Sequence, residues 1–168
     1  MKGIILFQSK HGSTRQYAEW IAEETGFPLI DLKQNVKPDL KDADILIIGS
    51  WVRAGKMISH GWIKKNWSSI QDKEVIVFAV GGDVPDEQIR KKVLDGSLPE
   101  GIKENISFYL LHGRFRQEDQ NIFLRKMLNF AAKYDKEDEL AQNMVKGVDG
   151  VKRDNLHDLF EKIRSLSK

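Results

Sequence analysis

Apolar residues gather along the chain in five short runs, each too short for a typical helix. The runs do not alternate strictly between apolar and polar positions, which is typical of parallel strands covered on both faces. Asp44–Gly49 is the most apolar run and is expected at the centre of a sheet, whereas Leu29–Leu32 is short and partly polar, as an edge strand should be. The five predicted strands are Gly3–Phe7, Leu29–Leu32, Asp44–Gly49, Glu74–Val80 and Ile106–Leu111.

Between these runs, apolar positions recur at helical spacing. The stretch that begins near Arg15 carries Tyr17 and Ile21 on one face and stops before Gly26. Strands that alternate with helices imply a parallel sheet with helices on both faces. We therefore predict an α/β fold, a doubly wound five-stranded parallel sheet in the order 2-1-3-4-5, with residues 1–168 forming one domain. The further predicted helices are Ser59–Ser69, Pro85–Leu94 and Asp154–Ser167, and Lys33–Asp42 is predicted as a loop.

An extra helical segment is predicted before the last helix. The apolar positions of Asn121–Tyr134 form one helical face. Three interpretations stay open for this segment: it packs on the body of the protein, contacts a partner or a quinone-bearing membrane surface, or covers the site as a lid. The charged stretch Asp135–Lys146 is interpreted as a solvated linker and Gly147–Gly150 as a turn. The apolar positions are Phe123, Leu124, Met127, Leu128, Ala131 and Tyr134.

The loop from Ser9 to Thr14 joins the first strand to the first helix. Its sequence is Ser-Lys-His-Gly-Ser-Thr, which is rich in hydroxyl groups and contains no carboxylate. A helix N-terminus presents unpaired N–H groups and the positive end of its dipole, so this loop suits a phosphate. The alternative is that Ser13 or Thr14 merely caps the helix. Only one glycine lies in the loop, which argues against dinucleotide and P-loop nucleotide motifs.

Two further loops follow the third and fourth strands. Ser50–Met57 contains Trp51, Arg53 and a glycine, and Gly81–Asp83 contributes small residues that leave the backbone accessible. In the predicted strand order these loops meet the first loop at the carboxyl ends of the strands, where doubly wound folds bind their ligands. A planar ring with a phosphate tail would match this set, with Trp51 stacked on the ring.

Composition limits the classes of function. The chain has 168 residues, of which 40% are hydrophobic and 31% charged, and its 27 Lys and Arg nearly balance 25 Asp and Glu. This balance gives no reason to expect nucleic acid as a partner. The absence of cysteine excludes disulfides, thiol nucleophiles and cysteine-ligated metals. No apolar run approaches the ~20 residues of a membrane span, so a cytoplasmic location is expected with at most peripheral membrane contact.

Other catalytic classes find little support in the motifs. A phosphoacceptor domain of this strand order needs acidic residues where Gln8, Ser9, Gly49 and Ser50 stand. The four histidines show no metal-ligand spacing, so no metal is expected. The G-x-S-x-G turn of serine hydrolases is absent. Among the histidines, His11 is the one expected to contribute to the site.

The sequence resembles the flavodoxin-like family. The first loop matches the family's phosphate loop at Ser9, Gly12, Ser13 and Thr14, with His11 in place of the usual threonine. Within the family it is most similar to the menaquinone-dependent protoporphyrinogen oxidase branch, through Ile5–Arg15, Ile48–Gly55 and His112–Phe115 and through the extra helical segment. The resemblance implies FMN as cofactor, bound by Ser9, Lys10, His11, Gly12, Ser13, Thr14, Ser50, Trp51, Val52, Arg53, Gly81, Gly82 and Asp83.

The charges near the expected flavin depart from those of electron-carrying flavodoxins, which are strongly acidic. Cations beside the ring would favour its negatively charged reduced form, raise its potential and attract an anionic substrate such as a porphyrin. Two functions stay open: an oxidoreductase that passes electrons from a bulky anionic substrate to a quinone, and a carrier between protein partners. No catalytic acid or base is assigned. The charged residues in question are Lys10, Arg53, Lys56 and Arg114, against Asp83.

Overall fold

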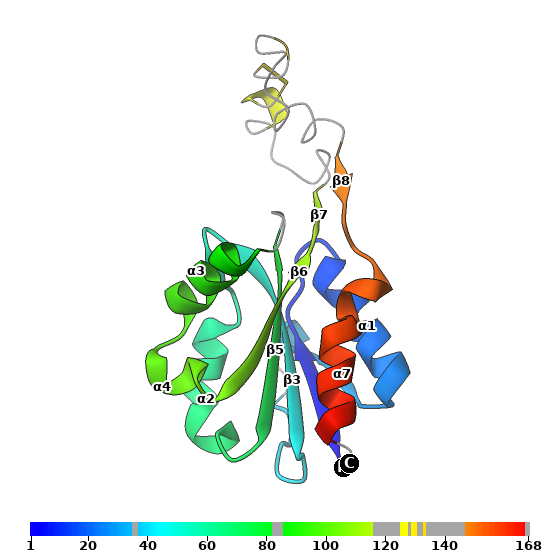
Figure 1. Ribbon diagram of the computed structural model, residues 1–168, viewed down its shortest axis with the longest axis vertical. Coiled ribbons are helices and arrows are strands. Elements are labelled where there is room, and N and C mark those ends of the chain that lie inside the picture. The colour runs from blue at the N-terminus through cyan, green and yellow to red at the C-terminus, as the bar shows by residue number, and fades with distance from the viewer. Residues whose placement is uncertain are drawn as a thin grey trace.

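The computed structural model describes residues 1–34, 37–81, 86–115, 125–127, 129–130, 133 and 147–166. A parallel sheet lies at its centre, with strands in the order β2-β1-β3-β5-β6 (Figure 1). Since β5 and β6 are the fourth and fifth of the predicted strands, the predicted order 2-1-3-4-5 is confirmed. The strands are β1 (Gly3–Phe7), β2 (Leu29–Asp31), β3 (Ile45–Arg53), β5 (Glu74–Gly81) and β6 (Ile106–His112).

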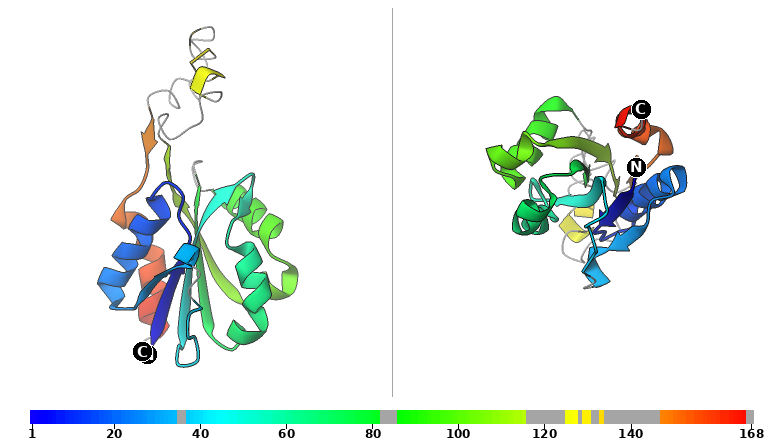
Figure 2. Two further views of the ribbon diagram at one scale, coloured as in Figure 1. Left: turned by 180° about the vertical axis from the view of Figure 1, so that it is seen from behind. Right: turned by 90° about the horizontal axis from the view of Figure 1, so that it is seen from below.

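Helices cover both faces of this sheet, with α1 and α7 on one face and α2, α3 and α4 on the other (Figures 1 and 2). Alternate side chains of each strand enter opposite cores. In β1, Ile5 and Phe7 pack toward α1 and α7, while Leu6 packs toward α2 and α3. The helices are α1 (Ser13–Thr25), α2 (His60–Ile70), α3 (Glu87–Ser97), α4 (Glu100–Lys103) and α7 (His157–Leu166), with 3-10 turns at Leu32–Gln34 and Arg153–Leu156.

The segment Ser50–Met57 differs from its prediction as a loop. Strand β3 continues to Arg53 and pairs antiparallel with β4 (Lys56–Met57) through the two-residue turn Ala54-Gly55. Both turn residues have positive φ, 48° and 73°, as a type I′ hairpin requires. Trp51 is therefore carried on a strand that extends directly from the sheet core.

A second two-stranded ribbon continues from the carboxyl end of β6 (Figure 1). Its strands are β7 (Arg114–Phe115) and β8 (Val148–Asp149), which pair antiparallel, so the prediction of a simple turn at Gly147–Gly150 was wrong. The extra helical segment predicted between them lies largely outside the described residues, as do Asp135–Lys146. Within it, Met127 and Phe130 are 51% and 64% exposed.

Candidate functional site

A cavity of about 270 Å³ opens at the carboxyl edge of the sheet. Four segments that are distant in sequence line it: the loop after β1, the end of β3, the end of β5 and the junction of β6 with β7. Its described lining contains cationic side chains and no carboxylate. The lining residues are Ser9, Lys10, His11, Ser13, Thr14, Trp51, Val52, Arg53, Val80, Gly81, Gly113 and Arg114.

The loop after β1 leads into the N-terminus of α1 through Gly12. Gly12 is the residue before the helix and adopts φ 89°, ψ −20°, a left-handed conformation that glycine reaches without strain. Its N–H donates to Ser9 Oγ at 3.2 Å, while Gln16 N–H donates to the Gly12 carbonyl at 2.9 Å. The N–H groups of Ser13 and Thr14 belong to the first turn, which has no acceptors within the helix. The loop therefore directs backbone donors and a helix dipole at the cavity.

Two contacts hold this loop against the sheet. Thr14 Oγ1 donates to the Ser50 carbonyl at 3.3 Å, which ties α1 to β3. The ammonium of Lys33 donates to the Ser9 carbonyl. Sequence reasoning missed Lys33 because the stretch it belongs to was interpreted as a loop, and only the pairing of β2 with β1 brings it there.

The β3 side of the cavity combines an aromatic ring with cations. Lys10 Nζ lies 5.5 Å from the centroid of the Trp51 ring, a cation–π contact. Ser50 anchors this end of β3, because its Oγ accepts the Ser59 N–H at 3.0 Å. Arg53 is exposed at the cavity wall. The predicted Lys56 is not among the lining residues; it lies on β4, whose neighbour is α3.

Close backbone packing forms the third side. A Cβ added at Gly113 would lie 2.4 Å from the Gly81 carbonyl oxygen, so only glycine permits this approach of β6 to β5. Arg114 Nε donates to Asp149 Oδ2 at 2.5 Å, which links β7 to β8 beside the cavity. Gly82 and Asp83, which sequence analysis placed in the site, lie outside the described residues.

Tyr17 supports the cavity wall at His112, the residue before Gly113. Its ring is fully buried, its hydroxyl donates to the His112 carbonyl at 2.8 Å, and Asn155 Nδ2 donates to that hydroxyl at 2.6 Å. Burial raises the pKa of Tyr17 above its ordinary value, against the lowering effect of the Asn155 hydrogen bond. The neutral phenol thus joins α1, β6 and the Arg153–Leu156 turn directly behind Gly113.

The predicted binding residues thus largely come together. Gly12 and Ser50 belong to the same two segments and shape them through their backbones and hydrogen bonds, without being part of the cavity wall. The structure adds three features that the sequence of each loop taken alone does not reveal: Val80 and Gly113 in the cavity wall, and the hydrogen bond from Lys33 to Ser9. The predicted residues that line the cavity are Ser9, Lys10, His11, Ser13, Thr14, Trp51, Val52, Arg53 and Gly81.

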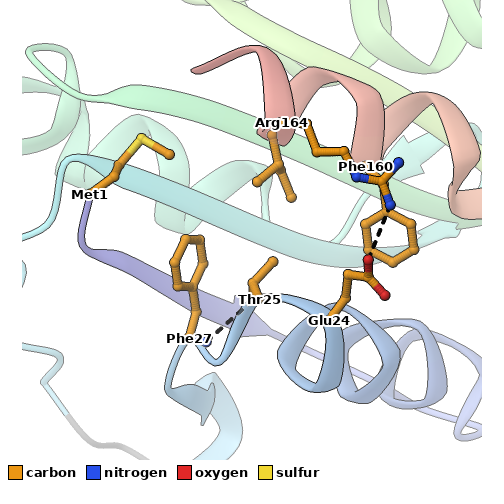
Figure 3. Close-up of a pocket in the computed structure, with 7 residues that line it drawn as sticks. Met1, Glu24, Thr25, Phe27, Phe160 and Arg164 are labelled. Atoms are coloured by element: carbon orange, nitrogen blue, oxygen red, sulfur yellow. Dashed lines mark hydrogen bonds and ion pairs between the residues drawn. The ribbon is translucent and has the colours of Figure 1, made fainter. Parts of the chain in front are cut away.

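A larger cavity, about 440 Å³, lies at the opposite end of the sheet, beside Met1 and the C-terminal turns of α1 and α7 (Figure 3). Its charged groups are committed to each other: Arg164 Nη2 is 3.1 Å from Glu24 Oε1, and Arg153 also bonds Glu24. Hydrogen bonds from Arg164 and Arg153 lower the pKa of Glu24 below its ordinary value. These contacts fasten α1 to α7, and the amino ends of parallel strands are not where such folds bind ligands.

The described residues lack the features of two other classes of site. No group of three or more His, Asp or Glu side chains in this part of the chain is arranged to hold a metal ion. No helix in the same residues has the length and apolar character needed to cross a bilayer.

The strand order, the loop at the start of α1 and the Trp51 end of β3 define a doubly wound α/β protein with a candidate ligand site at the switch point between β1 and β3. Comparison with known proteins is consistent with this class. The sequence model of the flavodoxin domain matches residues 4–141, and the chain belongs to that family.

Solved structures share the fold at low identity. A flavodoxin, WrbA-like protein from Agrobacterium tumefaciens is 16% identical, with 84% of this chain and 97% of that chain covered and a TM-score of 0.50. A protein from Bacteroides uniformis assigned as a flavoprotein is 14% identical, with 76% and 97% covered and a TM-score of 0.50. At these identities the similarity shows the fold alone. No curated protein matches the chain.

Proposed function

We propose that the protein binds FMN in the 270 Å³ cavity and is an oxidoreductase. The observation that carries this proposal is that the loop Ser9–Thr14, the Trp51 end of β3 and Gly81 line one cavity. Family membership supports FMN in particular, since flavodoxin-like proteins carry it. The cavity is slightly smaller than the ~300–1,000 Å³ usual for small-molecule sites. FMN would therefore fill it and extend along the open rim.

The residues fit a monophosphate bearing a flat ring. The α1 N-terminus and Gly12 would hold the phosphate through backbone N–H groups, as helix N-termini hold anions elsewhere. Trp51 provides an apolar surface for the ring, and Lys10 and Arg53 place positive charge beside it. When bound, FMN supplies the redox chemistry, and the protein contributes binding, orientation and electrostatics.

The cationic lining favours an anionic substrate. Lys10, Arg53 and Arg114 line the cavity with no carboxylate among the described lining residues, and of these three Arg114 is paired with Asp149 beside the cavity. We propose electron transfer from a bulky anionic substrate to a quinone or another redox partner, in the cytoplasm. Oxidation of protoporphyrinogen is the most specific form of this proposal. The second candidate is an electron carrier between proteins, which the two-residue turn between β3 and β4 favours because so short a hairpin would cover little of a bound ring.

The first experiment is a visible absorption spectrum of the purified protein, before and after dithionite, with FMN titration of any protein that lacks colour. A yellow protein that bleaches on reduction is expected. Protein that stays colourless and binds no FMN would refute the proposal. Turnover of protoporphyrinogen with menadione would then establish the substrate, whereas electron transfer to a protein acceptor without such turnover would favour the carrier.

A further inference from the structure

A second cavity, about 390 Å³, adjoins the first at the same edge of the sheet. The two cavities share Val52 and Gly81, so they meet where β3 and β5 end. The wall of the second cavity is mainly apolar, with Ile89 and Val93 of α3 and Leu110 of β6. This volume falls within the usual range of small-molecule sites.

The hairpin wall of this cavity contains a strained residue. Ala54 has a φ of 48°, although asparagine and glycine occupy this turn position with less strain. Ala54 is exposed and also lines the cavity, so an asparagine at this position would add a polar amide beside the apolar wall. The strain therefore coincides with a position at which a small apolar group keeps the wall apolar.

One cation stands at the margin of the apolar wall. Lys92 lines the cavity, its side chain is exposed, and its ammonium makes no ion pair among the residues that the structure describes. The neighbouring Lys91 is also exposed but does not line the cavity, and its charge lowers the pKa of Glu87 and of Asp95. An apolar wall with a single available cation matches an apolar molecule that carries one negative charge.

We propose that this second cavity binds the organic substrate, an apolar molecule with one carboxylate or sulfonate that pairs with Lys92. This inference rests on the proposed function, because the shared Val52 and Gly81 would place such a molecule beside the FMN site. Apolar contact with Ile89 and Val93 provides affinity, and Lys92 selects the anion.

The test is equilibrium binding of 2-naphthoate to the FMN-reconstituted protein, measured by calorimetry for wild type, Lys92→Gln and Lys91→Gln. Loss of a single exposed ion pair is expected to weaken binding by roughly fivefold in Lys92→Gln. Lys91→Gln, which removes the same charge one residue away, should bind as wild type does. Equal affinities in the two variants, or no binding to wild type, would overturn the proposal.

A second pair of variants tests the wall. Glycine and asparagine adopt a positive φ with less strain than alanine, so Ala54→Gly and Ala54→Asn should both fold with an unchanged or higher Tm. The glycine variant should keep naphthoate affinity and the asparagine variant should lose it several-fold; equal affinities in the two would count against the cavity. If the protein binds no FMN but binds naphthoate in a Lys92-dependent way, the second ligand site is supported and the proposed function is refuted. If the protein binds FMN but not naphthoate, only the second ligand site is refuted.

Discussion

Gly12 is the residue at which backbone conformation and anion binding meet. Its φ of 89° is left-handed, and a Cβ added there would meet nothing within 4 Å, so the cost of Gly12→Ala is conformational and not steric. We expect a loss of about 1–2 kcal/mol in the free energy of unfolding. FMN affinity should also fall, since the loop would turn its N–H groups away from the cavity. Urea unfolding and FMN titration measure the two effects.

Gly61 provides the matched control. It lies in the first turn of α2, its added Cβ would also meet nothing within 4 Å, and its φ is not positive. Alanine favours a helix over glycine by about 1 kcal/mol, so Gly61→Ala should stabilise the protein by up to that amount and leave FMN binding unchanged. Equal destabilisation by both substitutions would show that the left-handed conformation of Gly12 is not what matters.

Tyr17 gives a residue-scale prediction that depends on pH. Tyr17→Phe removes hydrogen bonds to the His112 carbonyl and from Asn155, which should cost about 1–2 kcal/mol near pH 8. The folded-state pKa of Tyr17 is raised, so its contribution is complete below the unfolded pKa of about 10 and is lost as pH rises through the folded value. Wild-type stability should therefore decline more steeply above about pH 10 than that of Tyr17→Phe. Urea unfolding across this range decides it, and parallel declines would contradict the assignment.

At the scale of elements, the hairpin of β3 and β4 depends on α3 for its position. The Met57 N–H donates to Ser97 Oγ at 2.9 Å inside the core, and the Gly55 carbonyl approaches α3 at Gly96. Ser97→Ala leaves the Met57 donor buried without its acceptor, which should cost about 1–3 kcal/mol. Because the hairpin carries Trp51, FMN affinity should fall as well. Thermal unfolding and FMN titration measure both.

Ser165→Ala is the control for this substitution. The Ser97 hydroxyl donates to the Val93 carbonyl of its own helix at 2.6 Å. Ser165 likewise donates its hydroxyl within a helix, to the Lys162 carbonyl at 2.7 Å, but this bond is exposed on α7. The loss should stay within about 0.5 kcal/mol, as for most surface substitutions. Ser97→Ala with unchanged stability and FMN affinity would show that α3 does not position the hairpin.

Strands and helices with a strong apolar pattern could be predicted from the sequence. Short strands that form only because they pair with another strand could not. The central strands are predictable because they are buried on both faces and therefore apolar throughout. Strand β4 has two residues, and its turn Ala54-Gly55 lacks the Asn-Gly or Asp-Gly pair that marks such hairpins. Strands β7 and β8 are equally short and far apart in sequence. Their pairing is a long-range contact that no local window contains.

The candidate site follows the same division. The loop Ser9–Thr14 and Trp51 are predictable, because strand ends carry the ligand groups of doubly wound folds. Lys33 and Gly113 are not, since their roles arise from contacts to Ser9 and Gly81 across the sheet. A local pattern identifies donors and aromatic rings, while the sheet decides which of them share a cavity.

At the scale of the whole molecule, charge is distributed unevenly about a small net value. The formal net charge is +2, yet Lys10 and Arg53 lie together at the candidate site, with Arg114 beside them in an ion pair with Asp149. In the cavity at the other end of the sheet, Arg164 and Glu24 form an ion pair with each other. A cleft lined by one sign of charge attracts ligands of the opposite sign, and this attraction is screened by salt. The site should therefore select acceptors by charge, although the protein as a whole is nearly neutral.

Reoxidation of the reduced FMN-reconstituted protein tests this selection. With an anionic naphthoquinone sulfonate the second-order rate should fall several-fold as ionic strength rises from about 0.02 M to about 0.5 M, where the Debye length drops well below 10 Å. With neutral menadione the rate should change little. Arg53→Gln should flatten the salt dependence for the anion, because it removes a cavity cation, whereas Lys2→Gln removes an exposed charge at the amino edge of the sheet and should not. If the anionic and neutral quinones respond equally to salt, the cations at the site do not steer anionic reactants, and the electron-carrier function becomes the better account of the protein.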